Sequence, residues 1–258
     1  MIKHLFKIFF IFISISKLIY LYPIPDPSKF IPESCKKNCS FDVIFGIEIG
    51  INNNVISYSN CDDHCADDTR VDQPVIFPKG ETSFKKDVDT GLRWQCVEYS
   101  RRWLVINKHS TYGDVRCATD IFDLKIAENL DNEKKYVFQS IPNGSPIPPT
   151  LGDLIIFPKN SLAPCGHVAV ITSVNLDLGF IEIAEQNYNG RWKEPNSYSR
   201  RLVILNCLKQ YTITQINWRE DFFDVNSPII NNLCSSEVEK VIGYKRVTKE
   251  VIITTNLK

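Results

Sequence analysis

Trp94-Gln95-Cys96-Val97-Glu98-Tyr99-Ser100-Arg101-Arg102-Trp103 combines the start of an expected helix with the clearest chemical signal in this chain. Apolar residues recur at helical spacing through this segment, so we predict a partly buried helix over residues 95–108. A cysteine in the first helical turn lies beside the positive end of the macrodipole and beside backbone N–H groups without intrahelical partners. Both features favour the thiolate, so Cys96 is the candidate nucleophile.

The elements expected around this helix are segregated along the chain. Before it we predict a strand, turn and strand over residues 41–59 and a long acidic loop over 60–92. A second helix is predicted over 117–130 and a proline-rich loop over 142–149. Strands follow at 153–157, 167–174, 179–185, 201–205, 211–216 and 242–247. This order predicts one α+β domain, residues 25–258, with N-terminal helices packed on an antiparallel sheet.

His167 and Glu185 lie on neighbouring predicted strands. Side chains alternate faces along a strand, so a hairpin with a symmetric turn centred on residue 176 would pair His167 with Glu185. Directly opposed residues have Cβ atoms about 4.5–5.5 Å apart, which would place the carboxylate beside the imidazole. A one-residue slip would move Glu185 to the opposite face. The alternatives are that His167 is an ordinary core residue and that Glu185 faces solvent.

Cys96, His167 and Glu185 together predict a thiol hydrolase. The thiolate would attack an amide carbonyl, His167 would protonate the leaving amine and then activate water, and Glu185 would orient the imidazole. The backbone N–H of Cys96 and the side chain of Gln95 would stabilise the oxyanion. This chemistry needs no metal and no cofactor, and we expect neither.

Nine cysteines and an apolar N-terminus point to the secretory pathway. Residues 1–24 have a basic start and short apolar runs, which predicts a signal peptide, with an uncleaved signal anchor as the alternative. Secreted proteins usually pair their cysteines, and because nine is odd, at least one stays outside intrachain disulfides. We expect Cys165, close to His167, to be in a disulfide; the alternative is a redox partnership with Cys96.

The overall charge excludes some classes of partner. Thirty Lys and Arg residues balance thirty Asp and Glu residues, so the chain has no net field for nucleic acid or an anionic membrane. We therefore expect no nucleic-acid partner and no stable membrane association once the signal is removed. The spacing of Cys35, Cys39, Cys61 and Cys65 permits a zinc site, although secretion favours disulfides.

Four segments share their residues and their order with one known family: residues 94–103, Pro142-Asn143-Gly144-Ser145-Pro146, Gly166-His167-Val168-Ala169-Val170-Ile171 and Ala184-Glu185-Gln186-Asn187. This set resembles the CHAP amidases, above all the amidase domain of glutathionylspermidine and trypanothione synthetase/amidases, over roughly residues 41–247. The resemblance implies a papain-like CHAP fold and catalytic roles for Cys96, His167 and Glu185. It also implies an oxyanion role for Gln95 and substrate binding by Arg101 and Asn187.

The resemblance leaves several functions open. The family also contains an ATP-dependent ligase half, for which this chain has no room, so we expect hydrolysis only. The expected substrate is a small peptide or a peptide–polyamine conjugate such as glutathionylspermidine, and a bacterial cell-wall peptide is the alternative. A secreted binding protein on an inactive scaffold is the third possibility, which the intact Cys96, His167 and Glu185 disfavour. Arg101 and Arg102 would form either a solvated helix face or an anion-binding element.

Overall fold

The computed structural model describes residues 43–61, 68–79, 82–188, 190–219 and 239–252, together with Cys35 and Cys65. The predicted signal peptide, residues 1–24, lies outside this part of the chain and stays a prediction. None of the helices in the described part combines the length and the apolar character needed to cross a membrane.

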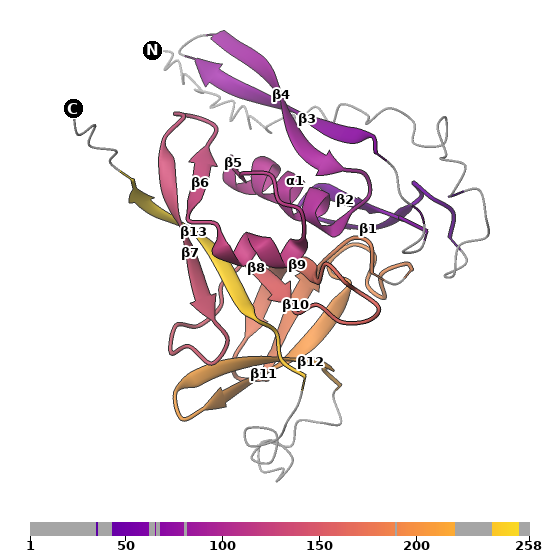
Figure 1. Ribbon diagram of the computed structural model, residues 1–258, viewed down its shortest axis with the longest axis vertical. Coiled ribbons are helices and arrows are strands. Elements are labelled where there is room, and N and C mark those ends of the chain that lie inside the picture. The colour runs from indigo at the N-terminus through magenta and orange to yellow at the C-terminus, as the bar shows by residue number, and fades with distance from the viewer. Residues whose placement is uncertain are drawn as a thin grey trace, which may run out of the picture.

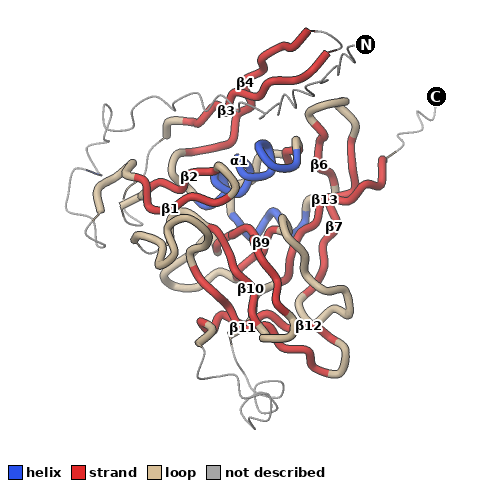
Figure 2. The backbone as a smooth tube through the Cα atoms, turned by 180° about the vertical axis from the view of Figure 1, so that it is seen from behind, coloured by secondary structure: helices blue, strands red, loops and turns tan. Residues whose placement is uncertain are grey.

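One antiparallel sheet of nine strands dominates the fold (Figures 1 and 2). Its order is β12-β11-β10-β9-β8-β13-β7-β6-β5, and each neighbouring pair is antiparallel. The strands are β5 (Ser110–Tyr112), β6 (Ile126–Asn129), β7 (Lys135–Pro142), β8 (Leu154–Phe157), β9 (His167–Asn175), β10 (Phe180–Ala184), β11 (Arg200–Cys207), β12 (Gln210–Asn217) and β13 (Gly243–Val251). The strands predicted in the second half of the chain are therefore present.

Helix α1 (Cys96–Lys108) lies between this sheet and two hairpins. The hairpins are β1 (Glu48–Asn52) with β2 (Val55–Tyr58), and β3 (Arg70–Lys79) with β4 (Thr82–Leu92). The helix contacts β9 and β5 of the sheet as well as β2, β3 and β4 of the hairpins (Figure 1). Tyr99, Trp103 and Leu104 are at most 1% exposed, and they pack with β9 residues Val168 and Val170. Replacing a buried tryptophan such as Trp103 by alanine typically costs about 3–5 kcal/mol.

The prediction of N-terminal helices packed on a sheet is wrong. In the described part of the chain, α1 and the short 3-10 helix η3 (Ala118–Asp123) stand against thirteen strands. The second predicted helix ends after Asp123, because Leu124 is extended with φ −62° and ψ 140°, and the chain continues as β6. Apolar residues at positions 124 and 126 are spaced as in a strand as well as in a helix, and pairing with β5 and β7 decides the outcome.

The acidic stretch 60–92 is not the predicted long loop, because β3 and β4 within it pair as an antiparallel hairpin. Val75 and Val88 of this hairpin are buried and pack against Val105 of α1. Acidic residues such as Asp72, Asp87 and Asp89 are uncommon in strands, so the composition of this stretch favoured a loop. Asp62, Asp63 and Asp67 of the same stretch lie outside the described residues.

Strand β9 connects two hydrophobic cores. Its residues Val168 and Val170 face the core that contains α1, whereas Ala169 and Ile171 face a second core built from β7 to β13. This alternation is the normal period of two in a strand. The first residue of β9 is His167, so the ring that the sequence singles out is held at the end of a strand buried on both faces.

Candidate active site

Cys96 is the first residue of α1, and the preceding Gln95 has an extended backbone with φ −85° and ψ 156°. The Cys96 side chain is close to fully buried, with the residue 8% exposed, and backbone hydrogen bonds from Val97 and Val168 reach its sulfur. Among the described cysteines, Cys96 is the one that is free. The structure thus places an unmodified thiol at the positive end of a helix.

The remaining described cysteines are oxidised. Disulfides link Cys35 to Cys65 and Cys117 to Cys165, and Cys61 and Cys207 are also disulfide-bonded. The bridge at Cys165 confirms the predicted disulfide and removes this residue as a redox partner of Cys96. The zinc alternative is wrong, because three of the four cysteines that it needs have no thiolate to offer.

His167 joins the thiol to the carboxylate. Its Nε2 lies 2.9 Å from Glu185 Oε2, and the ring also hydrogen-bonds Cys96, which leaves Nδ1 for the sulfur. The imidazole lies between two aromatic rings, with centroids 5.5 Å from Phe157 and 5.3 Å from Tyr188. The ring is therefore fixed in position by packing and oriented by hydrogen bonds at both nitrogens.

The hairpin register that predicted this contact is wrong by two residues, because Ile171 pairs with Ile183. Nearer the turn, the pairing follows an odd offset that would place Glu185 on the face opposite to His167. One extra β9 residue, Thr172, forms a bulge between Glu182 and Ile183 and shifts the register by one. Glu185 thereby returns to the face of His167, as its diagonal neighbour.

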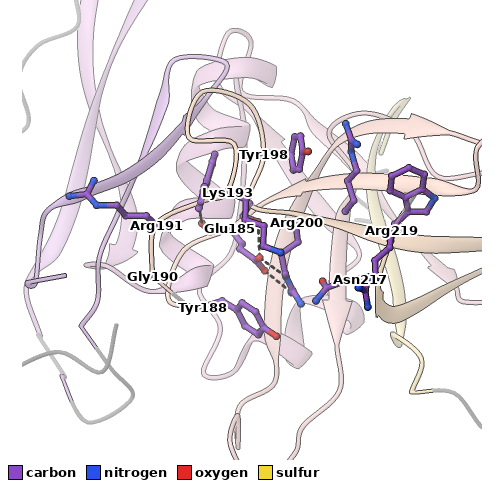
Figure 3. A pocket seen from close by; sticks show the side chains of 13 residues that line it. Glu185, Tyr188, Gly190, Arg191, Lys193, Tyr198, Arg200, Asn217 and Arg219 are labelled. Carbon is purple, nitrogen blue, oxygen red and sulfur yellow. Dashed lines mark hydrogen bonds and ion pairs between the residues drawn. The ribbon is translucent and has the colours of Figure 1, made fainter. Parts of the chain in front are cut away.

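Glu185 is 1% exposed and accepts four hydrogen bonds, and Figure 3 shows it beside Arg200. Oε1 accepts from Ser199 Oγ and from Arg200 Nε, both at 2.7 Å. Oε2 accepts from His167 Nε2 and from Arg200, both at 2.9 Å. Burial raises the pKa of Glu185, but the charge of Arg200 and the hydrogen bonds of His167 and Arg200 outweigh burial and lower the pKa to about 2.

Cys96 and His167 stabilise each other in their charged forms. Burial raises the pKa of the Cys96 thiol, but the charge and the hydrogen bond of His167 overcome this effect and place the pKa below its ordinary value. Burial likewise lowers the pKa of His167, whereas Cys96 and then Glu185 raise it to about 9. At neutral pH the arrangement therefore favours a thiolate next to an imidazolium.

A chain of three amides leads to Gln95. Asn60 Nδ2 donates to Asn187 Oδ1 at 3.0 Å, and Asn187 Nδ2 donates to Gln95 Oε1 at 2.8 Å. Because the oxygen of Gln95 is occupied, its NH₂ group is the part left to donate, and within the described residues it has no partner. Asn187 thus contacts the predicted oxyanion residue, and its contact with substrate stays a prediction.

Arg101 is 2% exposed and lies neither on a solvated face nor with its fork open to the site. Its terminal nitrogens donate to the carbonyls of Thr90 and Gly113 and to Asp114 Oδ1, at 3.1 to 3.3 Å. The guanidinium also lies over the ring of Tyr112, 4.8 Å from its centroid. These contacts hold α1 to neighbouring segments and do not favour the predicted binding of substrate by Arg101.

The adjacent Arg102 belongs to a buried polar cluster under the start of α1. Its Nε donates to Glu98 Oε1 at 2.6 Å. Gln186 donates to Glu98 Oε2 at 2.9 Å and to the carbonyl of Gln95 at 3.2 Å, and it accepts from Arg102. The cluster therefore ties the residue before the nucleophile to the segment that follows Glu185.

Sequence reasoning missed Arg200, Ser199 and Asn60. Arg200 opens β11 and pairs with Ile183 on β10, which brings its guanidinium to Glu185. A basic residue at the start of the strand after β10 is the signal that could have found it, once β10 and β11 were assumed to pair. Nothing in the local sequence singles out Ser199 or Asn60.

Comparison with known proteins identifies a domain in this part of the chain. The family model described as the CHAP domain matches residues 87–187. The chain contains a CHAP domain. The matched range begins just before α1 and includes Cys96, His167 and Glu185, so the three side chains that the structure brings together all lie within it.

Two proteins similar to this chain are named as synthetases, and one of them is also named as an amidase. Trypanothione synthetase of Crithidia fasciculata is 34% identical over 147 residues, which is 57% of this chain and 20% of that protein. Bifunctional glutathionylspermidine synthetase/amidase of Escherichia coli is 33% identical over 153 residues, which is 59% of this chain and 24% of that protein. The chain therefore spans only a fifth to a quarter of the length of these relatives, and the CHAP domain together with an amidase relative supports a hydrolase.

Proposed function

We propose that this chain is a cysteine amidohydrolase that cleaves an amide bond through a thioester. The observation that carries the proposal is the unbroken contact from the free thiol of Cys96, through His167, to the buried carboxylate of Glu185. The pKa shifts support the proposal, since the pKa of Cys96 is lowered, that of His167 is raised to about 9 and that of Glu185 is lowered to about 2.

The first half-reaction transfers the acyl group to sulfur. The Cys96 thiolate attacks the carbonyl carbon, and the carbonyl π electrons move to oxygen as the S–C bond forms. The oxyanion collapses, the C–N bond breaks, and the imidazolium of His167 gives its proton to the departing amine. Glu185 remains ionised throughout and stabilises the imidazolium before transfer.

The second half-reaction releases the acid. Neutral His167 takes a proton from water, the water oxygen attacks the thioester carbon, and collapse of the tetrahedral intermediate regenerates the Cys96 thiolate. In both steps the backbone N–H of Cys96 and the NH₂ of Gln95 are the donors for the oxyanion. Loss of one such donor typically costs about 3–4 kcal/mol of transition-state stabilisation.

We further propose that the enzyme acts in an oxidising compartment on a small peptide or peptide conjugate. The disulfides Cys35–Cys65 and Cys117–Cys165 support the compartment, since such bonds persist mainly outside the cytosol. The word amidase in the name of a relative makes glutathionylspermidine the first compound to test.

The test of this function is hydrolysis by the purified mature protein and by its Cys96→Ala variant. We expect the wild type to release amine from glutathionylspermidine or from a related peptide amide, and the variant to lose this activity by at least about 10⁴-fold. Cys96 should react rapidly with iodoacetamide near pH 7. A wild-type protein that hydrolyses no peptide amide, and whose Cys96 reacts no faster than a free thiol, would overturn the proposal.

A further inference from the structure

A cavity of about 350 Å³ is lined in part by Glu185, and cationic side chains dominate its lining (Figure 3). Glu185 is the single carboxylate in this lining, against five cationic residues: Arg191, Lys193, Arg200, Arg201 and Arg219. The volume is at the lower end of the range of small-molecule sites, about 300–1,000 Å³. A cavity with this imbalance of charge fits an anionic group and repels a cationic one.

Two of the five cations are compensated and form rigid walls. Arg200 is paired with Glu185 and lies 3.8 Å from the ring centroid of Tyr188. Arg201 is paired with Glu182 at 2.9 Å and lies over the rings of Phe180, Tyr198 and Trp218. These stacks fix the shape of the cavity, and they give it aromatic walls beside its charged groups.

Of the three remaining cations, Arg219 follows β12, and Arg191 and Lys193 lie in the loop after Tyr188. Arg191 extends away from the centre of the cavity (Figure 3). Its guanidinium donates to the carbonyl of Glu48 at 3.2 Å. Lys193 is exposed, lines the cavity and has no ion-pair partner among the residues that the structure describes. The acidic residue nearby is Glu194, whose charge acts on Tyr198. Lys193 is therefore a cation available to a ligand, and exposed Asn217 adds a neutral polar group.

The position of the cavity relates it to one end of a substrate. Tyr188 lines the cavity and lies 5.3 Å from the ring of His167, between centroids, so it connects the cavity to the imidazole. In the proposed reaction the leaving amine must lie next to His167, because His167 supplies its proton. Substrate atoms that extend from the leaving nitrogen past Tyr188 would enter the cavity.

We propose that the cavity binds a carboxylate on the leaving-group side of the substrate, so that the released amine is an amino acid or short peptide and not a polyamine. This inference rests on the proposed hydrolysis and specifies its substrate class. A carboxylate in the cavity would meet Lys193 and the exposed edge of Arg200 in charge-assisted contacts. A spermidine chain would place its ammonium groups among these same cations, at a cost that the acyl side would have to offset.

The test compares three substrates that share the glutathionyl acyl group and differ in the leaving amine: diglycine, diglycinamide and spermidine. Diglycinamide matches diglycine in size and lacks its charge. We expect kcat/KM for the substrate that releases diglycine to exceed that for the substrate that releases diglycinamide by about tenfold. The substrate that releases spermidine should have a lower kcat/KM still. Equal values for the first two substrates, or a preference for the spermidine amide, would overturn the proposal.

Charge reversal at Lys193 tests the site itself. Lys193→Glu should abolish the preference for diglycine over diglycinamide and raise the relative rate for spermidine, while Lys193→Gln should reduce the preference by a smaller factor. Lys134→Glu makes the same change at another exposed lysine and should leave the preference intact. The rate of Cys96 alkylation by iodoacetamide should be the same in all four proteins. A preference unchanged in both Lys193 variants would show that the cavity does not bind the carboxylate.

A binding measurement separates this inference from the hydrolysis on which it rests. Titration calorimetry with N-acetyl-diglycine and with its carboxamide, on the Cys96→Ala protein, should show binding of the carboxylate alone, and Lys193→Glu should remove it. If the wild type hydrolyses no amide while this binding persists, the hydrolysis proposal fails and the carboxylate site stands. If neither compound binds, or both bind equally, the carboxylate site is overturned.

Discussion

Glu98–Arg102 and Glu185–Arg200 are both buried glutamate–arginine pairs, but the two glutamates have different further hydrogen-bond partners. Both glutamates are 0% exposed at the side chain, and their arginines are 2% and 11% exposed. Around Glu98, the other partners are the hydroxyl of Thr90 and the amide of Gln186, neither of which titrates. Around Glu185, one partner is the imidazole of His167, which can release a proton.

The difference shows how the same local solution serves two purposes. In each pair, the arginine offsets the desolvation cost of the buried carboxylate, because it supplies charge and hydrogen bonds in place of water. The members of the Glu98 cluster hydrogen-bond one another, and Gln186 also donates to the carbonyl of Gln95. The cluster therefore holds the start of α1 in place. In the Glu185 cluster, the carboxylate hydrogen-bonds His167. Glu185 and Cys96 together raise the pKa of His167.

The sharpest way to break this comparison is to neutralise each glutamate in turn. Glu185→Gln should lower kcat on the order of 10³-fold, because the imidazolium loses the negative charge that stabilises and orients it. Glu98→Gln should lower kcat by less than about tenfold, since Glu98 does not contribute to the pKa shift of Cys96 or of His167. Each change also leaves a buried arginine uncompensated, so both should lower the free energy of unfolding by about 3–5 kcal/mol.

Steady-state hydrolysis and urea unfolding of both variants measure these effects. The comparable loss of stability is the internal control, because it shows that reduced folding alone does not account for the loss of activity in Glu185→Gln. Equal loss of kcat in both variants would show that the two clusters do not differ in the way proposed here.

The pH dependence sharpens the same comparison with a smaller effect. Hydrolysis should fall as pH rises through about 9, because His167 then loses the proton that the leaving amine needs, and it should fall at low pH as the Cys96 thiolate is protonated. Glu98→Gln should keep the alkaline limb near pH 9, and Glu185→Gln should move it lower. Profiles of kcat/KM against pH measure these limbs, and a flat profile from pH 5 to 10 would contradict them.

The lowered pKa of Glu185 also makes a statement about stability. Its folded-state pKa of about 2 lies below the ordinary value of 4.5, so its contribution to stability is fully present above pH 4.5 and is lost as pH falls through about 2. Thermal unfolding of the wild type between pH 5 and 2 should therefore lose more stability than that of Glu185→Gln.

Local sequence patterns predicted the elements that carry Cys96, His167 and Glu185, because buried strands and a cysteine at a helix start leave local signals. They did not predict how the strands pair, because the bulge at Thr172 depends on contacts across the hairpin and has no local sequence signal. The contact of His167 with Glu185 was predicted from a register that is wrong. It forms because the pairing near the turn would place Glu185 on the opposite face and the bulge at Thr172 returns it to the face of His167.

The errors elsewhere have a similar origin. Asp87 and Asp89, on either side of Val88, favoured a loop over the β3–β4 hairpin, whose buried apolar side chains pack on α1, a distant element. A solvated helix face was one alternative for Arg101 and Arg102, but the hairpins and strand β5 bury both. Partners supplied by tertiary structure decide whether an arginine is exposed, and one local segment does not contain that information.

A smaller effect is expected in the neutral chain Asn60–Asn187–Gln95, which lies beside the two charged clusters and contains no titrating group. If Asn187 sets the direction of the Gln95 amide, Asn187→Asp should be worse than Asn187→Gly. An aspartate can only accept, so Gln95 would turn its NH₂ toward residue 187 and present oxygen to the oxyanion. A glycine merely removes the restraint, and both residues tolerate the left-handed backbone at this position, where φ is 58°.

We expect kcat to fall about 100-fold in Asn187→Asp and about tenfold in Asn187→Gly, with little change in KM, because one oxyanion donor is typically worth 10²- to 10³-fold. Alkylation of Cys96 by iodoacetamide, which forms no oxyanion, should keep its rate and its pH dependence in both variants. If alkylation slows in step with hydrolysis, Asn187 acts on the thiolate–imidazolium pair and not on the oxyanion donor. If glycine is as harmful as aspartate, packing rather than hydrogen-bond direction explains its role, and the neutral chain belongs with the Glu98 cluster as support for the start of α1.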